Sequence, residues 1–308
     1  MKKSIGTYLK RVREKSPLVH NITNYVTVND VANVVLAIGA SPIMSDEPDD
    51  VSDITSICNG LNINIGTLNK RSIEAMYIAG KRANELGHVL LLDPVGAGAS
   101  ALRTNTALEL VDKLQFDVIR GNISEIKTIA TGSGTTKGVD ADSADIVTKD
   151  NLMQMVDFAK KLAKDLNVII AITGAIDLIA NGDKCYAIYN GNSAMSKITG
   201  TGCQLSALIT AFVSSITADL AGEQNNCIND YDMQNNDVTN SDMKNNDISN
   251  FKLEATVAAV CTMGLAGEIA FDRLSKEDGN STYRNKIIDA IYNMTGDMLE
   301  KGAKYECY

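Results

Sequence analysis

Residues 89–98 have the sequence VLLLDPVGAG, an apolar run that ends at an aspartate and continues into a proline and two glycines. Four apolar residues bounded by turn-forming residues predict a short buried strand over 89–92. Just before it, residues 69–86 carry apolar side chains at helical spacing and stop at Gly87, which predicts a helix. Because ligands of open α/β sheets bind beyond the carboxyl ends of the strands, Asp93 lies where a magnesium or phosphate contact is expected. The Asp-Pro pair is also compatible with a turn that only ends the strand.

The same alternation of strand and helix patterns continues in both directions along the chain. Further short β-rich runs occur at 18–22, 61–65, 117–119 and 168–172, and a second helical pattern covers 151–166. Short strands separated by helices of this length are typical of βαβ units on a mainly parallel sheet. We therefore predict an α/β fold with a mainly parallel central sheet flanked by helices.

The last third of the chain has a different pattern. Asn181-Gly182 lies between two alternating segments within 177–189 and predicts a hairpin with a type I′ turn at the edge of the sheet. Two helical patterns follow at 252–269 and 283–299. This part of the molecule is therefore predicted to be mostly helix.

Residues 222–250 are dominated by Asn and Asp and contain the near-repeat DMQNND and DMKNND. Such a segment has too little apolar surface to offset the entropy of ordering it, so we predict a disordered insertion. A calcium loop is the functional alternative, but the glycine and terminal glutamate of an EF-hand are missing. The whole chain, 1–308, is predicted to be one domain, because 308 residues with 44% hydrophobic and 22% charged residues suffice for one large core.

The charge and cysteine content narrow the function. A net charge of −9 without a Lys/Arg cluster argues against nucleic acid and anionic membranes as partners and favours a small molecule. The N-terminal segment lacks a secretory apolar core, and the apolar runs are far shorter than the ~20 residues of a membrane-spanning helix. Six scattered cysteines and two histidines give neither a disulfide pattern nor a zinc pattern. We expect a soluble, cytoplasmic protein with reduced thiols.

Residues 199–203, TGTGC, lead directly into an apolar helical pattern. Glycines let a backbone approach a ligand closely, and the first N–H groups of a helix point outward, so this arrangement predicts an anion-binding site. Such donors would stabilise the charge on a phosphoryl group during transfer. An ordinary loop with a glycine-rich helix start is the alternative.

A third motif is VIRGNISEI, residues 118–126, in which Asn122 and Glu125 are spaced as N-x-x-E. The two side chains share one face of a helical turn and would suit the hydration shell of Mg²⁺ beside a triphosphate. A capping box at the start of a helix explains the same spacing. P-loop, protein-kinase and Rossmann motifs are absent from the sequence.

Four ordered segments together resemble one known family. VHNITNYVTVNDVANVVLAIGASPIM at 19–44, DPVGAG, RGNISEI and ITGTGC are similar to hydroxyethylthiazole kinase. The resemblance implies a ribokinase-like fold and Mg²⁺-dependent transfer of the ATP γ-phosphoryl group to the hydroxyl of 4-methyl-5-(2-hydroxyethyl)thiazole. It also implies a homotrimer with active sites where subunits meet.

The resemblance also implies roles for particular residues. Met44 and Gly200 would contact the thiazole. Arg120 and Thr173 would contact the nucleotide.

The remaining implied roles concern the metal and the chemistry. Asp93 and Glu125 would organise magnesium and the phosphates, and Cys203 would be the catalytic residue. In the wider ribokinase class an aspartate usually follows G-x-G, so Cys203 argues against an ATP-dependent dehydratase of hydrated nicotinamide cofactor, the nearest alternative. A non-catalytic nucleotide sensor is a third hypothesis. His20 is a rival base, for which we favour a structural role, because the sequence shows no carboxylate to orient it.

Overall fold

A computed structural model describes residues 4–132, 146–222 and 245–308. Its centre is a sheet of nine strands in the order β2-β1-β3-β4-β5-β6-β7-β8-β9. All pairings from β2 through β6 are parallel, and the last three are antiparallel. The strands are β1 (Leu18–Ile22), β2 (Ser41–Met44), β3 (Gly60–Asn64), β4 (Val89–Asp93), β5 (Val118–Asn122), β6 (Ile169–Thr173), β7 (Asp177–Ala180), β8 (Cys185–Ile188) and β9 (Tyr305–Cys307). The predicted α/β class and mainly parallel sheet are confirmed.

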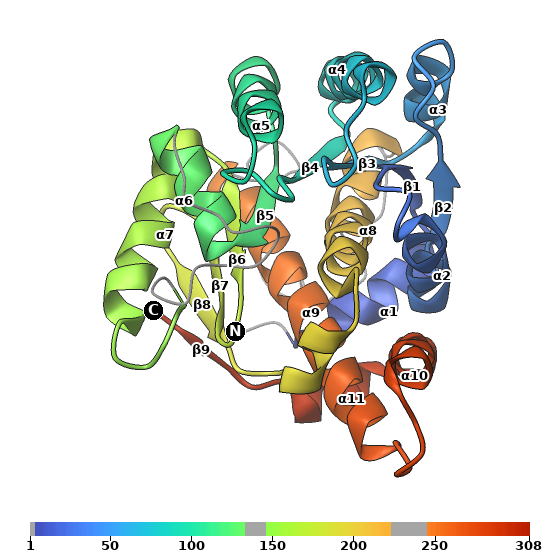
Figure 1. Ribbon diagram of the computed structural model, residues 1–308, viewed down its shortest axis with the longest axis vertical. Coiled ribbons are helices and arrows are strands. Elements are labelled where there is room, and N and C mark those ends of the chain that lie inside the picture. The colour runs from blue at the N-terminus through green and yellow to red at the C-terminus, as the bar shows by residue number, and fades with distance from the viewer. Residues whose placement is uncertain (1–3, 133–145, 223–244) are drawn as a thin grey trace, which may run out of the picture.

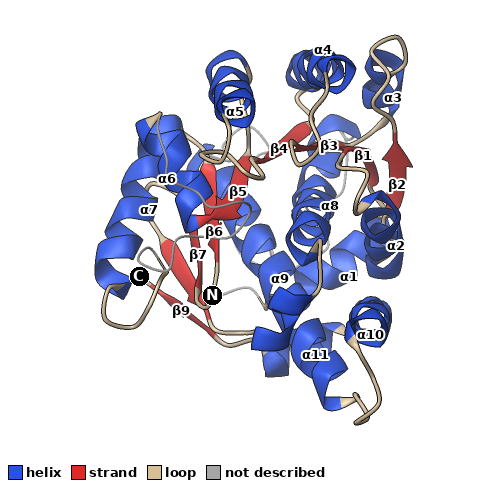
Figure 2. Cartoon of the chain, viewed as in Figure 1, coloured by secondary structure: helices blue, strands red, loops and turns tan. Residues whose placement is uncertain are grey.

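Helices cover both faces of the sheet (Figures 1 and 2). The helices are α1 (Gly6–Lys15), α2 (Val28–Ile38), α3 (Val51–Ile57), α4 (Lys70–Leu86), α5 (Ala101–Lys113), α6 (Ile123–Thr131), α7 (Leu152–Leu166), α8 (Thr201–Gly222), α9 (Asn245–Asp272), α10 (Asn280–Asn293) and α11 (Gly296–Gly302), with a 3₁₀ helix, η2 (Ser193–Lys197). One hydrophobic core lies under α1, α2 and α8–α11, and the other under α3–α7.

Strand β4 shows why the apolar run at its centre has no alternation. Val89 and Leu91 lie in the core under α8, whereas Leu90 and Leu92 lie in the opposite core. A strand covered on both faces needs apolar residues at every position. Because side chains alternate, Asp93 follows Val89 and Leu91 onto the α8 side. The strand pattern therefore determines which helix the aspartate meets.

Several predicted elements need correction. The hairpin exists, but its turn is not type I′: Gly182 is not among the described residues with positive φ. Instead the Asn181 side chain accepts hydrogen bonds from the N–H groups of Asp183 and Lys184, which stabilises the turn without that conformation. Sequence patterns also missed β2, a half-buried edge strand of four residues that contains a proline.

The helix predicted over 283–299 is two helices. The chain is extended at Met294 and Thr295, and the Thr295 hydroxyl caps α11 by accepting from the Met298 N–H. Part of the predicted insertion is also helical, since α9 begins at Asn245. Residues 223–244 lie outside the described residues.

One segment of α9, Ile248–Asp272, has the length and hydropathy of a membrane span. In its most apolar window 83% of the residues are buried inside the protein. The segment therefore has the burial of a core helix.

Helix α8 should carry much of the fold's stability, because Phe212 is among its fully buried residues. We expect Phe212→Ala to lower the free energy of unfolding by about 3–5 kcal/mol in urea denaturation, through lost burial and a residual cavity. Met153→Ala, at an exposed position of α7, is the control and should change it by less than about 0.5 kcal/mol. Equal effects of the two variants would contradict the assignment of α8 to the core.

Candidate active site

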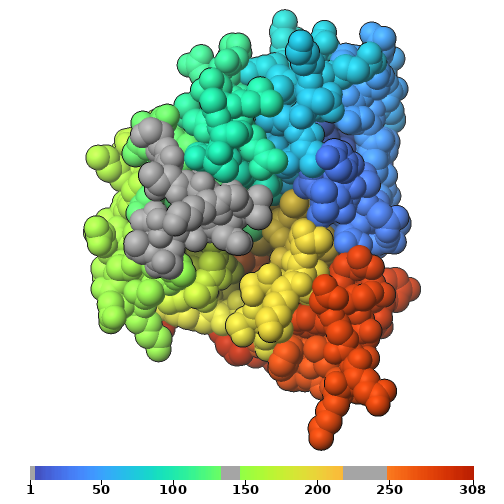
Figure 3. All heavy atoms as spheres, in the orientation of Figure 1, coloured from blue at the N-terminus to red at the C-terminus, as the bar shows by residue number. Residues whose placement is uncertain are grey.

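The carboxyl ends of the parallel strands meet the N-terminus of α8. Asp93 ends β4, Arg120 lies in β5 and Thr173 ends β6, while Gly202 and Cys203 lie in the first turn of α8. These segments are far apart in the sequence, yet Arg120 contacts both Asp93 and Thr173, and on the face drawn in Figure 3 blue-green and yellow parts of the chain adjoin. The three separate motifs of the sequence are thus brought to one place.

Asp93 is the centre of this cluster and is fully buried. Its Oδ2 accepts from Ser206 Oγ at 2.7 Å and from Asn64 Nδ2 at 2.8 Å, and lies 3.4 Å from Arg120 Nη1. Its Oδ1 is buried without a hydrogen-bond partner among the described residues. Burial raises the pKa of Asp93, and the Arg120 charge opposes that rise. A buried carboxylate oxygen without a partner is a ready acceptor for a ligand.

Arg120 joins the strand ends to the helix. Its Nη2 donates to Thr173 Oγ1 at 2.6 Å, while Nη1 faces Asp93. A Cβ added at Gly202 would lie 2.6 Å from Nη1, so the guanidinium packs on the first turn of α8. The two predicted nucleotide residues are therefore in contact, and Gly202 is the residue that makes room for them.

Of the two predicted thiazole residues, Gly200 contacts the β1–α2 loop and Met44 ends the edge strand β2. Gly200 has φ +86°, and an added Cβ would lie 2.2 Å from Thr27 Cγ2. Glycine is therefore required there for both conformation and space. Met44 ends β2, partly buried, and strands β1 and β3 separate it from β4. The structure thus does not bring Met44 into the Asp93 cluster.

Cys203 is buried beside the Asp93 cluster. Asn24 Nδ2 donates to its Sγ at 3.1 Å. Burial, followed by the negative charge of Asp93, raises the pKa of the thiol. A helix N-terminus favours a thiolate, whereas this burial favours the neutral thiol.

Glu125 and Asn122 form a capping box at the start of α6, which was one of the two interpretations of the N-x-x-E spacing. Glu125 Oε2 accepts from the Asn122 N–H at 2.8 Å, and Asn122 Oδ1 accepts from the Glu125 N–H at 2.9 Å. Glu125 Oε1 accepts from the Gly96 N–H at 2.8 Å. Both carboxylate oxygens therefore hold backbone groups, and Glu125 fixes the glycine loop after β4. Burial, then the charge of Asp93, raises the pKa of Glu125 to about 7.

His20 lies on the other face of the sheet, toward α3. Its Nε2 is 2.9 Å from the Ser45 carbonyl oxygen and its Nδ1 is 2.9 Å from Thr55 Oγ1. Nε2 must donate to the carbonyl, so Nδ1 accepts from the threonine. Burial lowers the pKa of His20, and both ring nitrogens of a neutral histidine are used in structural contacts.

Sequence reasoning missed Asn24, Asn64 and Ser206, which hold Asp93 and Cys203 in place. Ser206 follows Cys203 by three residues, and that helical spacing was a usable signal. The two asparagines follow or end strands β1 and β3, where polar residues are expected at a site. The pairing of side chains across strands was not visible in the sequence.

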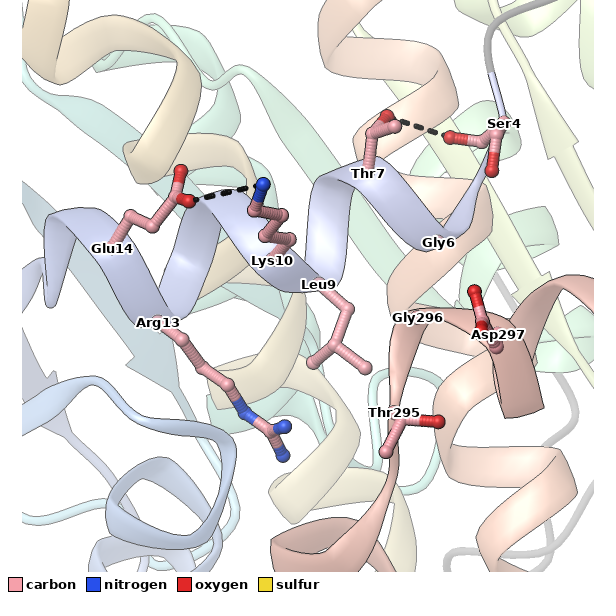
Figure 4. A pocket seen from close by; sticks show the side chains of 10 residues that line it. All are labelled: Ser4, Gly6, Thr7, Leu9, Lys10, Arg13, Glu14, Thr295, Gly296 and Asp297. Atoms are coloured by element: carbon pink, nitrogen blue, oxygen red, sulfur yellow. Dashed lines mark hydrogen bonds and ion pairs between the residues drawn. The ribbon is translucent and has the colours of Figure 1, made fainter.

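Two cavities lie near the surface. One, of about 490 Å³, lies between α1 and α11, with Leu9, Arg13 and Thr295 among its lining (Figure 4), and contains none of the predicted site residues. The other, of about 480 Å³, adjoins the loops after β1, β3 and β4, with Tyr25 and Arg103 in its wall. Only the second borders the strand ends that carry the site.

The fold is that of the ribokinase-like class of proteins. A solved ribokinase-like superfamily protein from Enterococcus faecalis matches with a TM-score of 0.53 and 10% identity, over 94% of this chain and 89% of that one, which shows the fold. The model of the hydroxyethylthiazole kinase family matches residues 9–252. The chain therefore belongs to the hydroxyethylthiazole kinase family.

Individual relatives agree with this assignment. A hydroxyethylthiazole kinase of Clostridium acetobutylicum is 54% identical over 97% of this chain and 98% of its own length. The solved structure of a hydroxyethylthiazole kinase protein from Pyrococcus horikoshii has a TM-score of 0.77 and 31% identity, and the match covers 99% of this chain and 98% of that one.

The raised pKa of Glu125 predicts a pH effect on stability. Because its folded-state pKa, about 7, exceeds its ordinary value of 4.5, the folded protein binds more protons than the unfolded chain between those pH values. Stability contributed by this group therefore falls as pH rises from about 4.5 to about 7. Glu125→Gln should remove this part of the slope in urea titrations across that range, and should also lower stability by about 1–3 kcal/mol through one lost acceptor. If the free energy of unfolding changed with pH in the same way in wild type and in Glu125→Gln, the raised pKa of Glu125 would be contradicted.

Proposed function

We propose that this protein transfers the γ-phosphoryl group of ATP to the hydroxyl of 4-methyl-5-(2-hydroxyethyl)thiazole. The names of its relatives support the substrate. The observation that carries the proposal is the meeting of Arg120, the partner-free Oδ1 of Asp93 and the first turn of α8 at one point. Cationic and N–H donors there suit a phosphoryl group in transfer.

The residues suggest how the transfer is organised. Arg120 and Thr173 would hold the nucleotide phosphates, because the guanidinium and the hydroxyl already lie together at the strand ends. Cys203, in the first turn of α8, would hold the alcohol. A loose transition state releases the alcohol proton late, when an oxygen of the transferred phosphoryl group can take it up and pass it to solvent, so a neutral thiol that only orients the hydroxyl is sufficient. The resemblance to the family places Gly200 and Met44 in contact with the thiazole ring, and Gly200, which adjoins Thr27 and Cys203, would lie nearer the reacting hydroxyl.

The site offers Mg²⁺ one available carboxylate oxygen and no cluster of protein ligands among the described residues. Among the described residues no group of three or more His, Cys, Asp or Glu side chains has the arrangement of a metal site. Mg²⁺ binds through one or two carboxylates together with substrate phosphates, and Asp93 Oδ1 is a buried carboxylate oxygen without a partner. We propose that Asp93 holds the ion and that Glu125 supports it by fixing the loop after β4. The ion would neutralise phosphate charge.

We further propose a cytoplasmic homotrimer. Tyr25, Val26 and Leu102 are large apolar side chains exposed on the loops after β1 and at the start of α5, beside the site. A neighbouring subunit would cover them, and analytical ultracentrifugation would measure the assembly. The five described cysteines are free thiols, which suits a reducing compartment.

The direct test of the function is ADP production with ATP, Mg²⁺ and the thiazole alcohol. We expect ADP release to depend on the alcohol and to match the thiazole phosphate formed. ADP release that requires hydrated nicotinamide cofactor instead would identify a dehydratase, and nucleotide binding without turnover would identify a sensor.

Cys203→Ala separates the thiol from the backbone donors of α8. We expect kcat to fall roughly 10²-fold, the low end of the range for general-base groups, because a thiol that only orients the hydroxyl contributes less than a group that takes up the proton. Cys203→Asp should retain activity, since a carboxylate accepts a proton at neutral pH. If alanine matched wild type in turnover from about pH 6 to 9, the thiol would be a packing residue only.

Gly202→Ala tests the packing of Arg120 on α8. The added Cβ would lie 2.6 Å from Arg120 Nη1 and would displace the guanidinium. We expect KM for ATP to rise about tenfold or more, which corresponds to one lost charged hydrogen bond. Gly279→Ala is the matched control, because its added Cβ meets nothing within 4 Å. An unchanged KM in the Gly202 variant would exclude Arg120 from nucleotide binding.

A further inference from the structure

A chain of buried amides links Asp93 to Cys203. Asn64 Nδ2 donates to Asp93 Oδ2, Asn24 Nδ2 lies 3.1 Å from Asn64 Oδ1, and the same nitrogen lies 3.1 Å from Cys203 Sγ. All four side chains are at least nine-tenths buried. Most buried polar groups are hydrogen-bonded and an N–H group can only donate, so the direction of each bond in this chain can be worked out from its neighbours.

The orientation of Asn64 is fixed by its neighbours. The Gly66 N–H, 2.9 Å away, can only donate, so it faces the carbonyl oxygen Oδ1 of Asn64. The amino group of Asn64 must then face Asp93, which the Arg120 guanidinium holds as an acceptor. Reversal of this amide would leave two donors facing each other at Gly66.

The orientation of Asn24 follows from that of Asn64. Because Asn64 presents an oxygen, Asn24 must turn its amino group toward it. Its own oxygen, Oδ1, then accepts from Thr27 Oγ1 at 3.0 Å. The second N–H of the Asn24 amino group is left for Cys203 Sγ. Sulfur is consequently an acceptor on this side. The Thr27 hydroxyl is also hydrogen-bonded to Cys203, and because its own hydrogen goes to Asn24, its oxygen can accept the thiol hydrogen.

We propose that Asn24 is a positioning residue of the phosphoryl transfer, which holds Cys203 Sγ in the rotamer that orients the substrate hydroxyl. The inference rests on the proposed function. An alcohol that donates its hydrogen to Sγ keeps an oxygen lone pair free for the γ-phosphorus. This role needs hydrogen-bond acceptance and no ionised thiol. Reactive geometry of this kind is sensitive to displacements of about 1 Å.

A double-mutant cycle between Asn24→Ala and Cys203→Ala tests this role. We expect Asn24→Ala alone to lower kcat with the thiazole alcohol about tenfold, as for one lost hydrogen bond, while KM for ATP changes less than about twofold. In the Cys203→Ala background, Asn24→Ala should lower kcat by less than about twofold, because the thiol that Asn24 positions is already absent. Asn33→Ala is the control: Asn33 is exposed on α2 and bonds only to Asn29 among the described residues, so kcat should be unchanged.

The opposite result is a full tenfold loss in both backgrounds. It would show that Asn24 acts independently of Cys203, as a structural residue, and would overturn the inference. Asn24→Ser, smaller and polar, replaces alanine if thermal unfolding shows that the alanine variant does not fold.

Calorimetric binding of the thiazole alcohol without ATP provides a cycle that needs no turnover. The binding free energy lost in the double variant should again be smaller than the sum of the losses in the Asn24→Ala and Cys203→Ala single variants. A wild-type protein that neither binds nor phosphorylates the alcohol would instead overturn the proposed function, together with this inference. Turnover by wild type with additive losses would overturn the inference alone.

Discussion

The site depends on burying the carboxylate of Asp93. A buried charge is strongly unfavourable unless it is paired and hydrogen-bonded. Asp93 receives its donors from three directions: Asn64 on the neighbouring strand β3, Arg120 on the other neighbour β5, and Ser206 on α8. The strand order and the position of α8 are both needed to supply them. One oxygen nevertheless has no hydrogen-bond partner among the residues that the structure describes, and it can accept from a ligand.

The general fold could be predicted because its signals are local. The apolar run of β4 and the helical spacing of α4 each lie within one stretch of chain, and the structure has both where they were expected. The break after Asn293 and the turn at Asn181 depend on single side chains that cap backbone groups. Capping competes with apolar periodicity, so a pattern that continues through 283–299 did not reveal the break.

The site could be predicted only in part, for a different physical reason. Asp93 and the TGTGC segment at 199–203 were recognised because strand ends and glycine-rich helix starts are local features. Asn24 and Asn64 are 40 residues apart in the chain, and their contact arises from the pairing of β1 with β3. Glu125 shows a further limit: a capping box and a metal-orienting carboxylate have the same N-x-x-E spacing, and the contacts with Gly96 and Asn122 were needed to establish the box.

A cysteine at the start of α8 is consistent with the electrostatics around Asp93. Burial and the negative charge of Asp93 raise the pKa of Cys203, and the same two causes raise that of Glu125. A carboxylate in place of the thiol, as in Cys203→Asp, can accept a proton from the alcohol but would repel Asp93 and so lower the stability of the folded protein. A neutral thiol adds no charge before a polyanionic nucleotide arrives. The Asn24 amide donates to the sulfur and so keeps a hydrogen-bond acceptor at this position without ionising the thiol. The site can therefore accept a hydrogen bond from the substrate alcohol without a second negative charge beside Asp93.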